Sequence, residues 1–194
     1  MDGIGSEPRR GRTTGGGGII LHPYELPTGP GLPMDTRIAP LAVILELNTR
    51  LFRNCLEGMD DEAGARRIDD RTNPPSFVAA HLLDARAYLA RLLGLEAAHP
   101  YREELAGVGH VDELERLPPL AGILEAWDDL SDRLLAALEE VDAETLEAPA
   151  GQPFPVDDAR LLGALAFLVQ HESYHIGQLA LLRKHAGLPA MTYE

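Results

Sequence analysis

Two histidines at helical spacing are the clearest chemical signal in this sequence. His171 and His175 lie four residues apart, within the segment His171-Glu172-Ser173-Tyr174-His175. Side chains at that spacing leave one face of a helix one turn apart, so both imidazoles can reach the same ion. Imidazole nitrogens bind Zn²⁺ at about 2.0 to 2.1 Å. The spacing predicts two ligands of a metal site, and a third must come from elsewhere in the chain.

His81 is the candidate for the third ligand, because it interrupts an apolar helical stripe where leucine or alanine would be expected. Three neutral imidazoles without a thiolate leave coordination positions for water, which is typical of a catalytic site. The alternative is that each histidine packs separately with a hydrogen-bonded partner. We interpret the other histidines as surface or tail residues: His22, His99, His110 and His185.

The same five residues match H-E-x-x-H, a zinc-protease signature in which the glutamate, here Glu172, serves as general base. A metzincin would continue with glycine and histidine at positions that Gln178 and Leu181 occupy. A glutamate-ligated protease needs a downstream carboxylate, and only Glu194 at the chain end follows His175. A protease is therefore disfavoured, while Glu172 stays a candidate for taking a proton at the site.

Helices must position these side chains, because the chain is rich in Leu, Ala and Glu and shows no alternating strand pattern. Gly58, Gly94 and Gly187 are expected to end helices, and Asn73-Pro74 to begin one. Residues 60–72 and 148–155 are expected to be loops, and residues 95–117 a connection with a helical turn near Asp112. Apolar residues recur at helical spacing in four long segments: residues 36–58, 74–93, 119–141 and 157–186.

Length and composition limit the architecture to one domain. The 194 residues, 45% of them hydrophobic, can form one substantial core but not two of typical size. Residues 1–33 are rich in glycine and proline without apolar periodicity, which predicts a disordered tail. A helical pattern follows Met34 at once, so we hypothesise that translation starts there. The prediction is an all-α antiparallel four-helix bundle over residues 34–194.

Charge and cysteine content exclude several classes of partner. Lys and Arg number 17 against 31 Asp and Glu, and a net charge of −14 repels nucleic acid. No apolar run is long enough to cross a membrane. The single cysteine, Cys55, cannot form an internal disulfide, which fits a reducing compartment and a cytoplasmic location.

The stretch Gln170 to Arg183, QHESYHIGQLALLR, resembles the last-helix signature of the DinB-like superfamily, H-E-x-x-H-x-G-Q followed by an apolar run. The stretch Phe77 to Asp84, FVAAHLLD, is similar to the second-helix motif of that family, which supplies the remaining histidine. With the Leu-Glu-Gly-Met turn at residues 56–59, the resemblance covers Met34 to Glu194.

The resemblance implies an up-down-down-up bundle, often dimeric, with one divalent ion (Zn, Ni, Fe or Mn) on His81, His171 and His175. It also implies a metal-dependent hydrolase or a thiol-dependent S-transferase. The partner would be a small-molecule substrate or a low-molecular-weight thiol, activated at neutral pH by the ion. The alternative is a non-catalytic metal-binding or stress-response dimerisation module whose site is structural or vestigial.

Several polar neighbours allow two interpretations. Asp84 either orients His81 or is an exposed helix residue, and Gln178 either binds substrate or ties two helices together. Asn48 is polar at a core-leaning position, and Tyr88 is expected to pack rather than to contact a ligand. Cys55 lies late in a helix on the apolar stripe, which disfavours a nucleophilic role.

Overall fold

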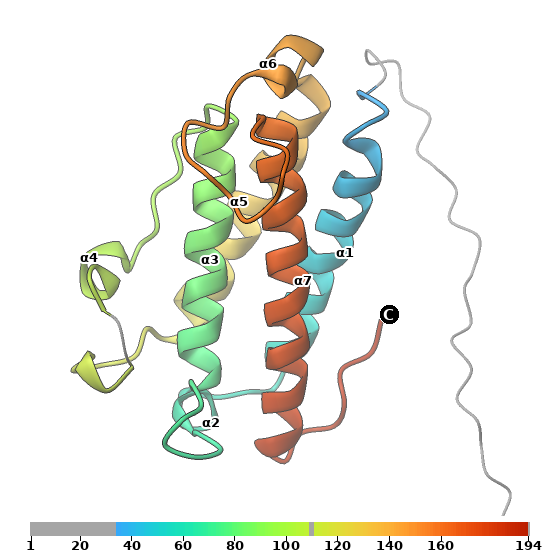
Figure 1. Ribbon diagram of the computed structural model, residues 1–194. Helices are drawn as coiled ribbons and strands as arrows, with labels where there is room; N and C mark the ends of the chain where they lie inside the picture. The colour runs from blue at the N-terminus through green and yellow to red at the C-terminus, as the bar shows by residue number, and fades with distance from the viewer. Residues whose placement is uncertain (1–33, 109–110, 194) are drawn as a thin grey trace, which may run out of the picture. The chain divides into compact units, whose positions relative to one another are not determined.

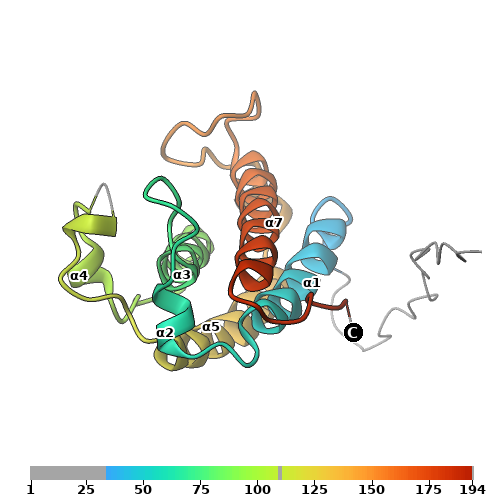
Figure 2. The ribbon, with the colours of Figure 1, turned by 90° about the horizontal axis from the view of Figure 1, so that it is seen from below.

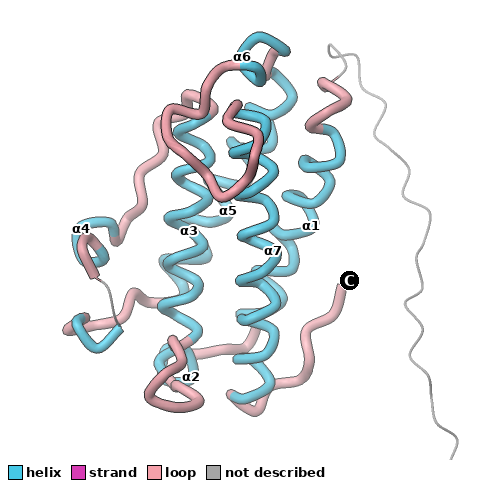
Figure 3. The backbone as a smooth tube through the Cα atoms, in the orientation of Figure 1, coloured by secondary structure: helices cyan, strands magenta, loops and turns pink. Residues whose placement is uncertain are grey.

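The computed structural model describes residues 34–108 and 111–193, whose regular structure is helical apart from an isolated bridge between Pro149 and Arg160 (Figures 1 and 3). The all-α prediction is confirmed, and each long helix is slightly shorter than predicted. The predicted tail, residues 1–33, lies outside the described residues. The long helices are α1 (Ala39–Leu56), α3 (Pro75–Leu92), α5 (Leu120–Glu140) and α7 (Leu161–His185). The short ones are α2 (Asp61–Ala65), α4 (Arg102–Leu105), the 3-10 turn η1 (Val111–Glu113) and α6 (Ala143–Glu147).

The long helices form a four-helix bundle in which α1 and α3 lie on a diagonal. Each of these two helices packs against both α5 and α7. α1 and α7 run in one direction and α3 and α5 in the other, so the order is up-down-down-up (Figure 1). Because α3 and α5 are parallel, their connection must return along the bundle. It does so on the outside of α3, where it carries α4 (Figures 1 and 2).

The core contains the apolar face of each helix, but on α3 that face differs from the predicted one. The residues that line the core are Val78, Leu82 and Leu89, whereas His81 and Tyr88 lie on the flank toward the solvent. The helical period was correct and the face was wrong, because apolar residues occur on both sides of this helix. As expected, Trp127 fills the core, where it stacks on Phe52 with ring centroids 3.9 Å apart.

The helix ends follow ordinary capping rules, with two corrections. α3 begins at Pro75 rather than at Pro74, and Asn73 does not cap it. The expected loop 60–72 contains α2, whose first turn is capped by the carboxylate of Asp60. No helix within the described ranges has the length and hydropathy that crossing a membrane requires. The predicted helix-ending glycines all have positive φ, of 71°, 80° and 84°: Gly58, Gly94 and Gly187.

Candidate metal centre

The structure brings the three predicted histidines together between two adjacent helices. His81 lies in the second turn of α3, and His171 and His175 lie on consecutive turns of α7, which packs against α3. One ring nitrogen from each side chain lies within 4.8 Å of the others. Within the described part of the chain, this is the one group of at least three His, Cys, Asp or Glu side chains so arranged.

The distances between the imidazoles fit a shared cation. Nε2 of His171 lies 3.2 Å from Nε2 of His81 and 3.1 Å from Nε2 of His175. Two nitrogens bound to one zinc ion at tetrahedral angles lie about 3.4 Å apart, and at right angles about 2.9 Å. A single proton on Nε2 of His171 can point at only one of its two neighbours, so it satisfies only one of the two contacts. A cation at the centre satisfies both, so the donor set fits a divalent ion.

A hydrogen bond orients one of the three rings. Nδ1 of His175 lies 2.7 Å from Oε1 of Gln178, and the Gln178 amide donates in turn to the Tyr174 hydroxyl at 3.2 Å. With the proton on Nδ1, the Nε2 lone pair of His175 faces the cluster, which is the arrangement that metal-binding histidines usually have. Nδ1 of His171 is buried and has no hydrogen-bonding partner among the described residues. Within the described residues, the Gln178 side chain bonds only to residues of its own helix, α7. It therefore orients His175 and does not join two helices.

The surroundings of two imidazoles, His81 and His171, disfavour their charged form. Partial burial and, to a smaller extent, the neighbouring His175 and His171 together lower the pKa of His81 to about 4, and the carboxylate of Asp84 opposes the shift. Burial and His175 also lower the pKa of His171, against the opposing charge of Glu172. Because a neutral imidazole is the form that binds a metal ion, both shifts favour coordination at neutral pH.

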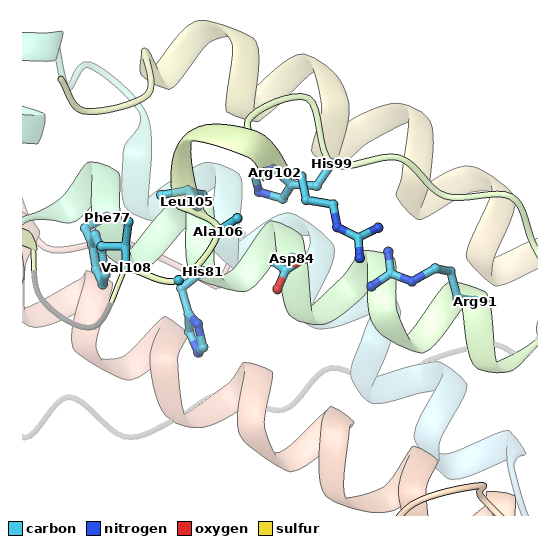
Figure 4. A pocket seen from close by; sticks show the side chains of 10 residues that line it. Phe77, His81, Asp84, Arg91, His99, Arg102, Leu105, Ala106 and Val108 are labelled. Atoms are coloured by element: carbon cyan, nitrogen blue, oxygen red, sulfur yellow. The ribbon is translucent and has the colours of Figure 1, made fainter. Parts of the chain in front are cut away.

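The cluster lies where two pockets meet. A pocket of about 430 Å³ extends from Phe77 and His81 along α3 to Arg91, and the α4 segment forms its other wall (Figure 4). A second pocket of about 270 Å³ also contains His81 and is bounded by His175 and Gln178. The larger volume is within the range of small-molecule sites.

Aromatic residues cover the other side of the cluster. The ring of Phe167 lies 5.9 Å from that of His171, and Phe154, in the loop before α7, lies 5.7 Å from Phe167. Tyr88 of α3 closes this row, with its ring 6.2 Å from that of Phe154. The aromatic row thus lies against His171, whereas His81 and His175 line the pockets.

Glu172 lies in the bundle core and not in the site. Its side chain is 1% exposed, and its two oxygens accept hydrogen bonds from Nε and Nη2 of Arg86 at 2.8 and 2.7 Å. Arg86 also donates to the hydroxyls of Thr49 and Ser131 and lies 3.6 Å above the ring of Trp127. Both carboxylate oxygens are occupied away from the histidines, so the geometry gives no support to Glu172 as a general base.

The other polar candidates divide between core and surface. Asn48 is buried, as expected, and donates to Oγ of Ser173 at 3.1 Å. Asp84 is exposed in the larger pocket and acts on His81 through its charge, without a hydrogen bond to that ring within the described structure. The buried Cys55 thiol donates weakly to the Ile176 carbonyl at 3.7 Å. This environment does not favour a nucleophilic role.

His99 was wrongly interpreted as a surface residue, because it is only 4% exposed. Its Nε2 lies 3.0 Å from the Ala80 carbonyl, and its Nδ1 accepts the backbone N–H of Tyr101 at 3.0 Å. This side chain pins the segment before α4 to α3. Sequence reasoning missed it because His99 belongs to no periodic stripe. His185 is exposed as predicted, whereas His22 and His110 lie outside the described residues.

Comparison with known proteins agrees with this architecture. A sequence model of the DinB superfamily matches residues 44–179. The solved structure of YfiT from Bacillus subtilis, described as a probable metal-dependent hydrolase with an unusual four-helix bundle topology, is 20% identical. It aligns with a TM-score of 0.58 over 85% of this chain and 95% of its own. No curated protein sequence is significantly similar. The family match spans most of the chain and confirms the resemblance, so this protein belongs to the DinB superfamily.

Proposed function

We propose that this protein is a metal-dependent hydrolase that acts on a small molecule, with His81, His171 and His175 as the ligands of one divalent ion. The observation that supports this most directly is the meeting of three Nε2 atoms from two helices, with separations of 3.1 and 3.2 Å from the central one. The description of YfiT as a probable metal-dependent hydrolase agrees with this proposal.

The donor set favours an active rather than a structural ion. Three imidazoles without a thiolate would leave coordination positions open, and His81 also lines a pocket of about 430 Å³, large enough for a small molecule. A divalent ion held there would lower the pKa of a bound water to about 7 and so provide hydroxide at neutral pH.

The residues of this chain have distinct tasks in the proposal. The burial that lowers the pKa values of His81 and His171 favours their neutral form, in which one nitrogen of each ring has a lone pair free to bind a metal ion. Gln178 holds the ring of His175 in the tautomer whose Nε2 faces the cluster. Phe167 lies against His171 and limits the access of water from that side.

Elemental analysis of untagged protein, purified without a nickel column, tests the metal site. We expect about one divalent ion per chain, and zinc, nickel, iron and manganese should all be measured because imidazole sites accept several of them. His81→Ala should lose the ion and still melt cooperatively, whereas His185→Ala, at an exposed position of α7, should retain it. Metal-free wild-type protein, or an unchanged metal content in His81→Ala, would refute the site.

A substrate screen tests the reaction. We expect metal-dependent hydrolysis of activated esters or amides by wild type and its loss in His81→Ala. Transfer to a low-molecular-weight thiol stays a prediction of the family resemblance and belongs in the same screen. If the metal-loaded protein turns over none of these substrates and unfolds when the metal is removed, the non-catalytic alternative is favoured.

A further inference from the structure

We propose that the substrate carries an anionic group, a carboxylate or a phosphate, that is bound by Arg91 and Arg102 in the larger pocket. This inference deepens the proposed function, since it assigns a substrate class to the same site. It rests on the position of the two arginines, on their lack of acidic partners and on the way the fold holds α4.

The two arginines approach each other at the end of the pocket away from the metal ligands. His81, Asp84 and Arg91 lie at intervals of three and seven residues and so share one face of α3. Arg102 comes from α4, the opposite wall. Figure 4 shows the guanidinium groups of Arg91 and Arg102 close together, with Asp84 between them and His81.

Neither guanidinium group is neutralised by a described carboxylate. The side chain of Arg102 makes no hydrogen bond or ion pair within the described residues, and Arg91 donates from Nη1 to the Ala97 carbonyl at 3.1 Å. Asp84 lines the same pocket but forms no ion pair with either of them. In a chain with 31 acidic and 17 basic residues, acidic partners are abundant.

Two like charges that face each other repel, and an anion between them turns that repulsion into attraction. Carboxylate and phosphate oxygens match the planar donor array of arginine and accept two hydrogen bonds from it. The remaining donors of Arg91 and all those of Arg102 are available for this purpose. The pocket therefore attracts anions although the whole chain carries a net charge of −14.

The fold holds Arg102 in place before a ligand arrives. His99 is buried, and its ring joins the Ala80 carbonyl of α3 to the backbone N–H of Tyr101, next to Arg102. Tyr101 in turn lies so close to α5 that a Cβ on Gly122 would come within 1.9 Å of its hydroxyl oxygen. A wall fixed at two points loses less entropy on binding than a loose loop would.

The spacing also limits the shape of the substrate. His81 and Arg91 are ten residues apart on one helix, so their Cα atoms lie about 15 Å apart along its axis. The arginine side chains shorten this distance but do not close it. We therefore expect an elongated molecule whose reactive bond lies at one end and whose anionic group lies at the other.

Isothermal titration with suberate and, separately, with inorganic phosphate tests the arginine site without any reaction. We expect at least one anion to bind wild type with millimolar or better affinity. Binding should weaken at least tenfold in Arg102→Gln and further in Arg91→Gln/Arg102→Gln. Arg133→Gln, which removes an exposed arginine of α5, should bind as wild type does. The two titrations distinguish a carboxylate site from a phosphate site.

The His171→Ala variant separates the arginines from the ion, because it should lose the metal and still bind the anion. Anion binding that disappears with His171, equal affinity in wild type and the double arginine variant, or no binding of either anion would each overturn the proposal. Retained anion binding in a protein that hydrolyses nothing would reject the hydrolase and support the arginine site.

A matched pair of substrates connects the two proposals. A p-nitrophenyl monoester of suberic acid and its methyl-capped diester differ only in the charge at the far end. We expect kcat/KM to be at least tenfold higher for the charged ester in wild type and in Arg133→Gln, and this preference to vanish in Arg91→Gln/Arg102→Gln. Hydrolysis of both esters at equal rates by wild type would support the hydrolase and refute the anion site for suberates.

Discussion

His171 and Glu172 are neighbours in the sequence and lie in opposite environments. His171 is half-buried, faces two other imidazoles and has an unpartnered Nδ1. Glu172 is buried, and both of its oxygens are bonded to Arg86. Successive residues of a helix point about 100° apart, so one turn of α7 contributes both to the pocket side and to the bundle core.

This difference shows that residues of one sequence motif can belong to two separate sites, here a histidine cluster and a buried polar network. The histidines of H-E-x-x-H converge with His81, as a metal site requires. The glutamate instead belongs to a polar network that joins all four long helices through Arg86, Thr49 and Ser131. A protease signature assigns chemistry to the glutamate. In this bundle Glu172 is part of the packed core. Variants of Glu172 should therefore lose stability, whereas variants of His171 should lose metal binding.

The largest expected effect comes from breaking the buried ion pair. Arg86→Met leaves the Glu172 carboxylate buried without its cation, which should lower the free energy of unfolding by about 3 to 5 kcal/mol. Urea unfolding of metal-free protein measures this change. The fraction that remains folded should still bind one metal ion, because Arg86 does not contact the histidines.

A double-mutant cycle sharpens this prediction. Arg86→Met/Glu172→Leu removes both charges and should be much less destabilised than the sum of the single variants. The exposed pair of Arg133 and Asp129 on α5 is the control, and its removal should leave stability nearly unchanged. Additive effects of Arg86→Met and Glu172→Leu would show that the pair does not hold the core.

A smaller effect is expected at the histidine cluster, on its affinity for a metal ion. Gln178→Leu keeps the approximate volume but removes the acceptor 2.7 Å from Nδ1 of His175. Loss of such an orienting partner typically weakens metal binding by about 10- to 100-fold. Competition with a chromogenic zinc chelator measures the affinity, and Gln170→Leu, at an exposed position of α7, is the control. Equal affinities would mean that the ring of His175 needs no orientation.

The metal-free protein should lose stability in acid through the histidine cluster. The pKa of His81 is lowered from 6.5 to about 4 in the folded chain, mainly by burial. Between these pH values the unfolded chain binds a proton that folded His81 does not, so acidification favours unfolding. Above about pH 6.5 neither state binds that proton, and the effect is absent.

Urea unfolding at pH 7.5, 6.5, 5.5 and 4.5 tests this. His81→Ala should show a shallower loss of stability with falling pH than wild type, and His185→Ala should follow wild type. Parallel curves for His81→Ala and wild type would contradict the assigned pKa. The Arg86–Glu172 pair sharpens the contrast, because there two buried side chains of opposite charge pair with each other, whereas the surroundings of His81 disfavour a charge.

The sequence predicted the helices and the histidines well because both depend on local spacing. A four-residue interval places His171 and His175 on one face in any helix, and a glycine with positive φ is a common end of a helix, as at Gly58, Gly94 and Gly187. The third candidate ligand, His81, was identified by the resemblance and by its place in a periodic stripe. The core-facing side of α3 was predicted wrongly, since apolar residues surround this helix too evenly to define one direction.

Contacts between distant segments could not be predicted in this way. His99 seemed to be a surface residue because its partners, the Ala80 carbonyl and the Tyr101 amide, are backbone groups that leave no trace in a pattern of residue types. Glu172 and its partner Arg86 are 86 residues apart in the sequence. The place of Glu172 in the H-E-x-x-H motif pointed instead to a role as general base. The close approach of Arg91 and Arg102 likewise depends on how α4 folds back over α3.

The smallest effect is expected from Cys55, which lies on the core side of the comparison. Burial raises the pKa of its thiol to about 11, against the opposing charge of Arg183. At neutral pH the thiolate fraction is then roughly a hundredfold below that of a free cysteine. The native protein should react with Ellman's reagent far more slowly than the urea-unfolded protein, and Cys55→Ala should keep the metal content and any hydrolytic rate of wild type. Fast labelling of the native chain would contradict a buried, protonated thiol. Loss of activity in Cys55→Ala with the fold intact would mean that the thiol takes part in the reaction.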